Sequence, residues 1–174
     1  MDLAPTTMGD SPLLLLDLDD TLCLNKPYGG RHLQLSPRPP DLYQRLWSAP
    51  AVDALQQVLR EARPQVVLTT SWLSFLDLAA ARQLFELTGL ESLAHALHPD
   101  GEAPQLRGQT RAEAIDTWLR RYARTGRYAI VDDPLSGTGL RRSRHDRSGR
   151  VVFCEVDVGL SQVHVPRLLR ALTR

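Results

Sequence analysis

Short apolar runs alternate along the chain with stretches of helical periodicity. Residues 13–16 are leucine at every position, which is typical of a central strand that is buried on both faces of a parallel sheet. Further strand-like runs are predicted at residues 65–70, 127–131 and 151–156. Apolar residues at helical spacing predict helices at residues 52–62, 74–85, 110–122 and 165–172. This alternation predicts an α/β fold, a three-layer sandwich with a mostly parallel, Rossmann-like sheet.

Capping residues mark two of the predicted helix starts. Ser74 with Asp77, and Thr110 with Glu113, fit the capping-box pattern in which two side chains satisfy free backbone N–H groups. Residues 90–106 fit no single pattern. Within them, residues 92–97 are the candidate for a short strand.

The length of 174 residues fits one domain, and 43% hydrophobic residues suffice for a core. We expect residues 1–11 to form a flexible leader and residues 12–174 to form the single domain. Residues 25–50 contain five prolines and several glycines and arginines, which predicts an irregular flap.

The composition bears on which partners the protein binds and in which cellular compartment it is expected. The net charge of +1 provides no overall field that recruits nucleic acid or a membrane. Lys26 is the only lysine among 21 basic residues, so arginine supplies the rest; this fits either a GC-rich genome or phosphate binding by guanidinium groups. The two cysteines, Cys23 and Cys154, form no disulfide framework or metal-ligand spacing. No apolar run is long enough to span a bilayer, and we expect a cytoplasmic protein.

Polar side chains follow three of the predicted strands. They are Asp17 and Asp19, Thr70 and Ser71, and Asp132 and Asp133. The carboxyl ends of parallel strands lie along one edge of a sheet, so these residues are expected to converge there. Carboxylates this close repel one another unless a cation or a proton intervenes. Oxygen ligands of this kind suit Mg²⁺, which takes further ligands from water and from phosphate.

The stretch from Asp17 to Leu22, DLDDTL, behind an apolar strand resembles the first motif of the haloacid dehalogenase (HAD) superfamily. Thr70 resembles the second motif and the pair Asp132-Asp133 the fourth, in the right order over nearly the whole domain. The sequences TSW at 70–72, VDD at 131–133 and GLS at 159–161 are similar to HAD domains of Swiss Army Knife RNA-repair proteins.

This resemblance implies a Mg²⁺-dependent phosphohydrolase that forms a phospho-aspartate. It implies that Asp17 attacks phosphorus and that Asp19 protonates the leaving oxygen and then activates water. Thr70, with Ser71, would bind the phosphoryl group. The metal would be held by Asp17, by the backbone carbonyl of Asp19, and by Asp133 with or without Asp132.

One departure from the family pattern concerns the third motif, which is normally a lysine before the fourth strand. No lysine follows Lys26. Arg111 is the candidate substitute and Arg107 the second, because arginine supplies the charge with a wider, planar head. The alternative is a weak or inactive relative, a HAD-like module that binds phosphate or a partner without turnover. A receiver domain is discounted, because its phosphorylated aspartate lies on the third strand and it needs a late lysine.

The segments between the motifs are short, which predicts a minimal cap and an open site. HAD members of this kind act on large substrates, so nucleic-acid ends or phosphoproteins are expected partners. Residues 141–150 contain five arginines and a histidine; they form either a solvated loop or a patch for a polyanion. Trp72 and Trp118 are expected in the core, and the five histidines show no ligand spacing.

Overall fold

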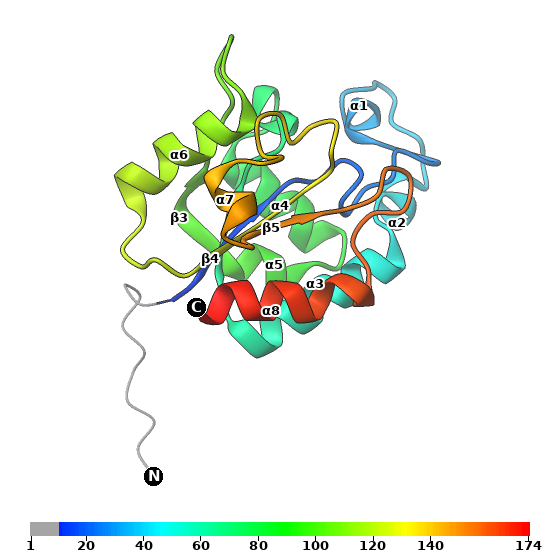
Figure 1. Cartoon of the computed structure of the whole chain (residues 1–174). Coiled ribbons are helices and arrows are strands. Elements are labelled where there is room, and N and C mark those ends of the chain that lie inside the picture. The colour runs from blue at the N-terminus through cyan, green and yellow to red at the C-terminus, as the bar shows by residue number, and fades with distance from the viewer. Residues whose placement is uncertain (1–10) are drawn as a thin grey trace.

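The computed structural model describes residues 11–174 and contains a five-stranded sheet between layers of helices (Figure 1). The strand order is β3-β2-β1-β4-β5, and every neighbouring pair is parallel. The strands are β1 (Leu13–Leu16), β2 (Gln65–Leu68), β3 (Leu97–Glu102), β4 (Tyr128–Asp132) and β5 (Val151–Phe153). The predicted α/β class with a Rossmann-like parallel sheet is confirmed.

The leucines of β1 alternate between two hydrophobic cores. Leu14 and Leu16 pack on one face of the sheet, and Leu13 and Leu15 pack on the other. Burial of each leucine contributes roughly 2 kcal/mol relative to exposure, so a strand that is apolar at every position belongs at the centre. This explains why the run carries no alternating polar residues.

Helices cover both faces of the sheet and complete the three layers (Figure 1). The first core includes residues of α3 (Ala49–Ala62), α4 (Leu78–Leu87), α5 (Glu91–Ala96) and α8 (Val165–Thr173). The second core is covered by α6 (Arg111–Tyr122). Short helices lie in the connections, namely η1 (Ser71–Ser74), α7 (Arg144–Arg147) and η2 (Gln162–His164).

The two predicted capping boxes have different outcomes. At α6 the prediction is confirmed, because the Thr110 hydroxyl accepts from the Glu113 backbone N–H and the Glu113 carboxylate accepts from the Thr110 N–H at 2.7 Å. At Ser74 it is wrong. Asp77 is itself the N-cap of α4, and its carboxylate accepts from the Ala80 N–H at 2.8 Å. An aspartate serves as the cap as readily as a serine does, so the pattern placed the helix start three residues early.

The strand proposed at residues 92–97 is also wrong, because α5 occupies Glu91–Ala96 and β3 begins at Leu97. β3 is an edge strand whose sequence, LHPDGE, is mostly polar. Its pairing with β2 is irregular, with partners Val66↔Leu97 and Leu68↔Glu102. An edge strand of this composition carries little of the apolar signal on which strand prediction depends.

Residues 25–48, most of the predicted flap, are irregular apart from the one-turn helices α1 (Gly30–Leu33) and α2 (Leu42–Arg45), and α3 begins at Ala49. Their role as a flap stays a prediction. Leu33, Leu42 and Leu46 bury this segment in the first core, and polar and aromatic contacts add to this attachment. Lys26 pairs with Asp157 at 2.9 Å, and the Trp47 ring stacks on Trp72 with centroids 5.7 Å apart.

The predicted leader, residues 1–11, lies outside the described residues except for Ser11, and the single domain over residues 12–174 stays a prediction. Across residues 11–174, no helix combines the length and the apolar character that crossing a membrane requires.

Candidate active site

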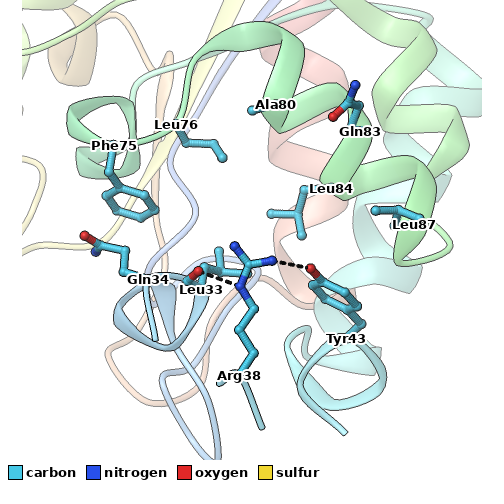
Figure 2. Close-up of a pocket in the computed structure, with 10 residues that line it drawn as sticks. All are labelled: Leu33, Gln34, Arg38, Tyr43, Phe75, Leu76, Ala80, Gln83, Leu84 and Leu87. Atoms are coloured by element: carbon cyan, nitrogen blue, oxygen red, sulfur yellow. Dashed lines mark hydrogen bonds between the residues drawn. The ribbon is translucent and has the colours of Figure 1, made fainter. Parts of the chain in front are cut away.

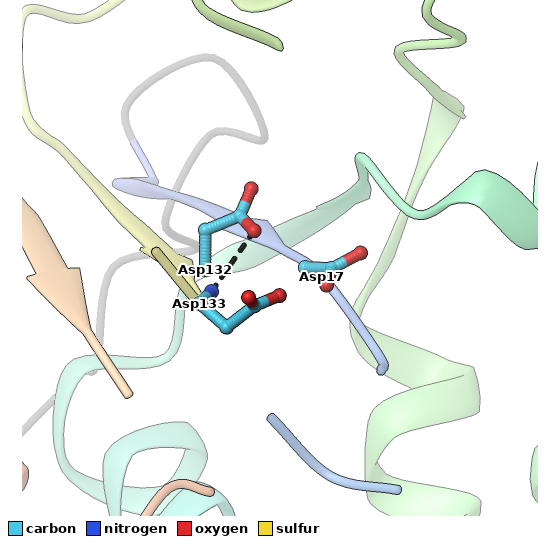
Figure 3. A group of neighbouring side chains, drawn as sticks. All are labelled: Asp17, Asp132 and Asp133. Atoms are coloured by element: carbon cyan, nitrogen blue, oxygen red, sulfur yellow. Dashed lines mark hydrogen bonds between the residues drawn. The ribbon is translucent and has the colours of Figure 1, made fainter. Parts of the chain in front are cut away.

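Three buried carboxylates meet where β1 and β4 end. Asp17 directly follows β1, and its backbone N–H donates to the Val131 carbonyl of β4 at 3.0 Å. β1 has β2 on one side and β4 on the other, so the connections run in opposite directions from it. Ligands of open α/β sheets bind at such a position, outside the carboxyl ends of the strands. Ligand oxygens of Asp17, Asp132 and Asp133 lie within 4.8 Å of one another (Figure 3).

Backbone hydrogen bonds hold two of these carboxylates in place. Asp132 Oδ1 accepts from the Asp133 N–H at 2.9 Å, as Figure 3 shows. Asp133 Oδ1 accepts from the N–H groups of Leu135 and Ser136, at 2.7 and 3.1 Å. The Oδ2 atoms of Asp17, Asp132 and Asp133 are buried without a hydrogen-bond partner within residues 11–174. Buried polar atoms are rarely left unpaired, so three such oxygens at one place fit a hard cation such as Mg²⁺.

Burial makes it unfavourable for the three carboxylates of Asp17, Asp132 and Asp133 to be ionised at the same time. It raises the pKa of Asp17 to about 7, an effect that Arg111 reduces and that the charge of Asp19 increases. Burial also raises the pKa of Asp132 well above its ordinary value, and the charge of Asp17 adds to that shift. A bound cation would remove this penalty, because it favours the ionised forms.

Arg111 is the first residue of α6, the helix that covers the second core. Its guanidinium reaches the carboxylates from that side of the sheet. Its backbone N–H donates to the Thr138 hydroxyl at 2.9 Å, which fixes the start of α6 against the loop after β4. Nη2 donates to Asp17 Oδ1 at 3.5 Å, and Nε lies 3.1 Å from Asp132 Oδ2 without the alignment of a hydrogen bond. The residue is only 2% exposed. Its guanidinium therefore contacts carboxylates that come from two different strands.

Asp19 lies beside this group and has different partners. Its Oδ2 accepts from the indole N–H of Trp72 at 2.9 Å and from the Ser71 hydroxyl at 3.4 Å, while its Oδ1 has no partner in the described chain. Burial raises the pKa of Asp19, and the Trp72 bond partly offsets that rise. Oδ2 of Asp19 is thus held by hydrogen bonds, while Oδ1 is unbonded within the described chain. The raised pKa means that this carboxyl group retains its proton more readily than an exposed aspartate does.

The carboxylate of Asp19 is not part of the cluster that could hold a metal. Metal ligation by the backbone carbonyl of Asp19 is a separate expectation and stays a prediction. Trp72 is a site contact that its assignment to the core did not anticipate. The ring is buried, as expected, but its N–H reaches Asp19. The available signal was its position directly after Thr70 and Ser71, at the end of a central strand.

Thr70 is buried at the end of β2, and its hydroxyl oxygen accepts from the Trp72 backbone N–H at 3.3 Å, capping η1. Its O–H remains available as a donor. Ser71, by contrast, is exposed and uses its hydroxyl on Asp19. The roles of both residues toward phosphate stay predictions.

The family described as "HAD domain in Swiss Army Knife RNA repair proteins" matches residues 13–165. The chain belongs to this family. The match covers all five strands and every residue of the site described above, and the family indicates hydrolase activity on phosphate. A search among curated proteins finds no match to the chain.

Arg107, the second candidate for the third motif of this HAD domain, lies away from the carboxylates. It is exposed before α6 and lines a surface hollow of about 420 Å³ together with Asp116 and Arg120. Arg111 is thus the arginine that the fold brings to Asp17, although its function as the substitute for lysine stays a prediction.

The basic segment, residues 141–150, is exposed at most of its arginines but contacts neighbouring parts of the domain at several points. Its two predicted roles, a solvated loop or a patch for a polyanion, stay predictions. Arg144 pairs with Asp116 at 2.6 Å, and the Arg141 guanidinium lies over the Phe153 ring at 5.0 Å. Arg150 donates to the Tyr128 carbonyl at 3.1 Å. These contacts leave Arg142 and Arg147 as the exposed arginines of the segment whose side chains have no such contact in the described chain.

Proposed function

We propose that this HAD domain is a Mg²⁺-dependent phosphohydrolase that works through a phospho-aspartate on Asp17 and removes phosphate from nucleic-acid ends. The observation that carries the proposal is the surroundings of Asp17. Its carboxylate is buried, it has a guanidinium 3.5 Å away, and it shares a small space with the unpaired oxygens of two further aspartates.

In the first step, an oxygen of Asp17 attacks phosphorus, and the bond from phosphorus to the substrate's bridging oxygen breaks. Asp19 gives its proton to that leaving oxygen. The pKa of Asp19 is raised by burial, which is the direction that a general acid requires. The indole bond fixes one carboxyl oxygen and leaves the other free for proton transfer.

In the second step, water attacks the phosphorus of the phospho-aspartate. Asp19, now ionised, accepts the proton from that water. The bond between phosphorus and the Asp17 oxygen then breaks, which releases inorganic phosphate and restores the carboxylate. The O–H of Thr70 is available to donate to a phosphoryl oxygen, since the one hydrogen bond of this hydroxyl within residues 11–174 is accepted from a backbone N–H.

Asp17 and Asp133 are the best-placed metal ligands, because Oδ2 of Asp132 already lies 3.1 Å from Arg111. Bound Mg²⁺ would supply positive charge that offsets repulsion between the nucleophile and an anionic substrate. Arg111 adds to that charge and can form two N–H bonds with one phosphoryl group.

The nucleic-acid part of the proposal is supported by the family's association with RNA repair and by the small size of the flap. A segment with two one-turn helices covers the site less than a full cap domain would, which favours a large substrate. A terminal phosphomonoester is the group that one nucleophile and one proton donor can remove in this way.

The test is the release of inorganic phosphate from 5′- and 3′-phosphorylated oligonucleotides and from p-nitrophenyl phosphate, with Mg²⁺ and with EDTA. We expect turnover with Mg²⁺ and none in EDTA or in Asp17→Asn. Asp53→Asn, the same change at an exposed aspartate of α3, is the control. Wild-type protein that binds phosphorylated ends without turnover would instead support the non-catalytic module.

A further inference from the structure

A groove of about 400 Å³ lies between the flap and α4, outside the site described above. Its walls are largely apolar, with Leu33 on the flap side and Leu76 and Leu84 on the α4 side (Figure 2). The volume falls within the roughly 300–1,000 Å³ that is typical of small-molecule sites.

One charged group lies in this groove, and the flap holds it in a fixed position. Arg38 Nε donates to the Leu33 carbonyl and Nη1 donates to the Tyr43 hydroxyl, both at 2.8 Å, as Figure 2 shows. Within residues 11–174, Nη2 has no hydrogen bond and the guanidinium has no acidic partner within 4.0 Å. A positive charge that is held but not neutralised is a binding group for an electron-rich or anionic ligand.

The groove is connected to the candidate active site through aromatic rings. Phe75 lines the groove, is 37% exposed, and has its ring centroid 6.2 Å from that of Trp72. Trp72 in turn donates to Asp19 at 2.9 Å. Gly30 of the flap lies against the same indole, where a Cβ would come within 2.5 Å of Nε1. One buried tryptophan therefore contacts both the proton donor and Phe75, the aromatic residue that lines the groove.

We infer that the groove binds one unpaired nucleobase of the substrate, next to the phosphate that is removed. The base would stack on Phe75, and its edge would receive N–H groups from Arg38. Unpaired bases are recognised in this way, by stacking on aromatic rings and by hydrogen bonds along their edges. Gln34 and Gln83 also line the groove and offer both donors and acceptors. This inference rests on the proposed function, because it assigns the substrate class of the same site.

The chemistry of the groove favours a base over an apolar side chain of a phosphoprotein. A leucine or phenylalanine buried here would fill the apolar walls but would cover the Arg38 guanidinium without pairing it, which is unfavourable. A base brings a planar apolar face together with carbonyl or ring-nitrogen acceptors. It satisfies the guanidinium and the aromatic ring at once.

The experiment measures binding rather than turnover, in EDTA, by fluorescence anisotropy of short single-stranded RNA labelled at the end away from the phosphate. Four ligands are compared, with and without the terminal phosphate and with a normal or an abasic terminal nucleotide. The proteins are wild type, Phe75→Ala, Arg38→Ala and the control Leu106→Ala, which truncates an exposed apolar residue before α6.

We expect wild type and Leu106→Ala to bind the normal end about tenfold more tightly than the abasic end, with or without the phosphate. Phe75→Ala should bind both ends equally, and Arg38→Ala should lose part of the preference. A general loss of folding would weaken the binding of both ligands alike and would leave the ratio of their affinities unchanged. A change in that ratio therefore reports on the groove itself.

The inference is overturned if wild type shows no preference for the normal end, or if Phe75→Ala retains the whole preference. It is also overturned if a phosphopeptide with a neighbouring leucine loses affinity in Phe75→Ala while RNA does not. Failure of the proposed function would abolish phosphate release but leave the base preference. Failure of this inference would remove the base preference while hydrolysis continues.

Discussion

The indole N–H of Trp72 lies 2.9 Å from Oδ2 of Asp19, although 53 residues separate the two along the chain. The contact forms because Asp19 follows β1 and Trp72 follows the neighbouring strand β2. It holds the carboxyl group that the proposed mechanism uses for both proton transfers. A buried ring thereby serves the core and the site together.

Trp72→Phe removes this N–H but retains a buried aromatic ring. We expect kcat to fall about ten- to hundredfold with KM little changed, because the carboxyl group that carries both proton transfers loses the hydrogen bond that fixes its position. Steady-state kinetics on p-nitrophenyl phosphate measures the effect. Trp118→Phe is the matched control, since Trp118 is equally buried and donates its N–H to the Asp100 carbonyl at 2.7 Å. Equal losses of kcat in the two variants would contradict the role of Trp72.

Arg111→Ala should reduce kcat/KM roughly a hundredfold or more, which is typical for the loss of one group that stabilises developing charge. Arg111→Lys should restore part of it, since the charge returns without the planar head. Arg107→Ala, at an exposed arginine, should be unaffected. Thermal unfolding of each variant is needed as well, because removal of a buried charge partner destabilises the fold. Full activity in Arg111→Ala would show that Arg111 does not replace the lysine of the third motif.

Asp19→Asn should lose roughly 10²–10⁴-fold in turnover, the range that general acid–base catalysis contributes. Asp17 remains able to attack an activated substrate with a good leaving group. Phospho-enzyme is therefore expected to accumulate, because no base remains for the second step. Mass spectrometry of the intact protein detects it after mixing with an aryl phosphate. A loss of only a few-fold would remove Asp19 from this role.

The contribution of Asp17 to stability in EDTA should fall as the pH rises from about 4 to about 7. The pKa of Asp17 is raised from 3.8 to about 7 in the folded protein, chiefly by burial. The folded state therefore keeps a proton that the unfolded state has already released, so raising the pH favours unfolding across this window. The raised pKa of Asp132 acts in the same direction.

Urea unfolding at several pH values tests this expectation. Relative to wild type, Asp17→Asn should gain stability as the pH rises, Asp53→Asn should not, and Mg²⁺ should stabilise wild type more at pH 8 than at pH 5. The larger effect at high pH follows because the metal binds the ionised carboxylates. Equal stabilisation by Mg²⁺ at both pH values would argue against the buried aspartates as its ligands.

The sequence was most informative where one local signal decides the structure. A short apolar run such as Leu13–Leu16, with carboxylates directly after it, favours a buried strand, and the Thr110–Glu113 pair marks the start of α6. β3 was missed because its place depends on pairing with β2 at the edge of the sheet, which its polar residues do not reveal. The contacts of Arg111 and Trp72 likewise depend on how helices and strands distant in sequence come together.

The N–H of Asp17 is part of the β1–β4 ladder, bonded to the Val131 carbonyl at 3.0 Å. Its amide hydrogen can exchange with solvent only when the central sheet opens, so its protection should approach that of the global unfolding reaction. The backbone of the flap takes no part in the sheet ladder, although Leu33, Leu42 and Leu46 pack in the first core. Evolution of new substrate preferences can therefore act on the flap and the groove, while the position of the nucleophile is inherited from the most stable part of the molecule.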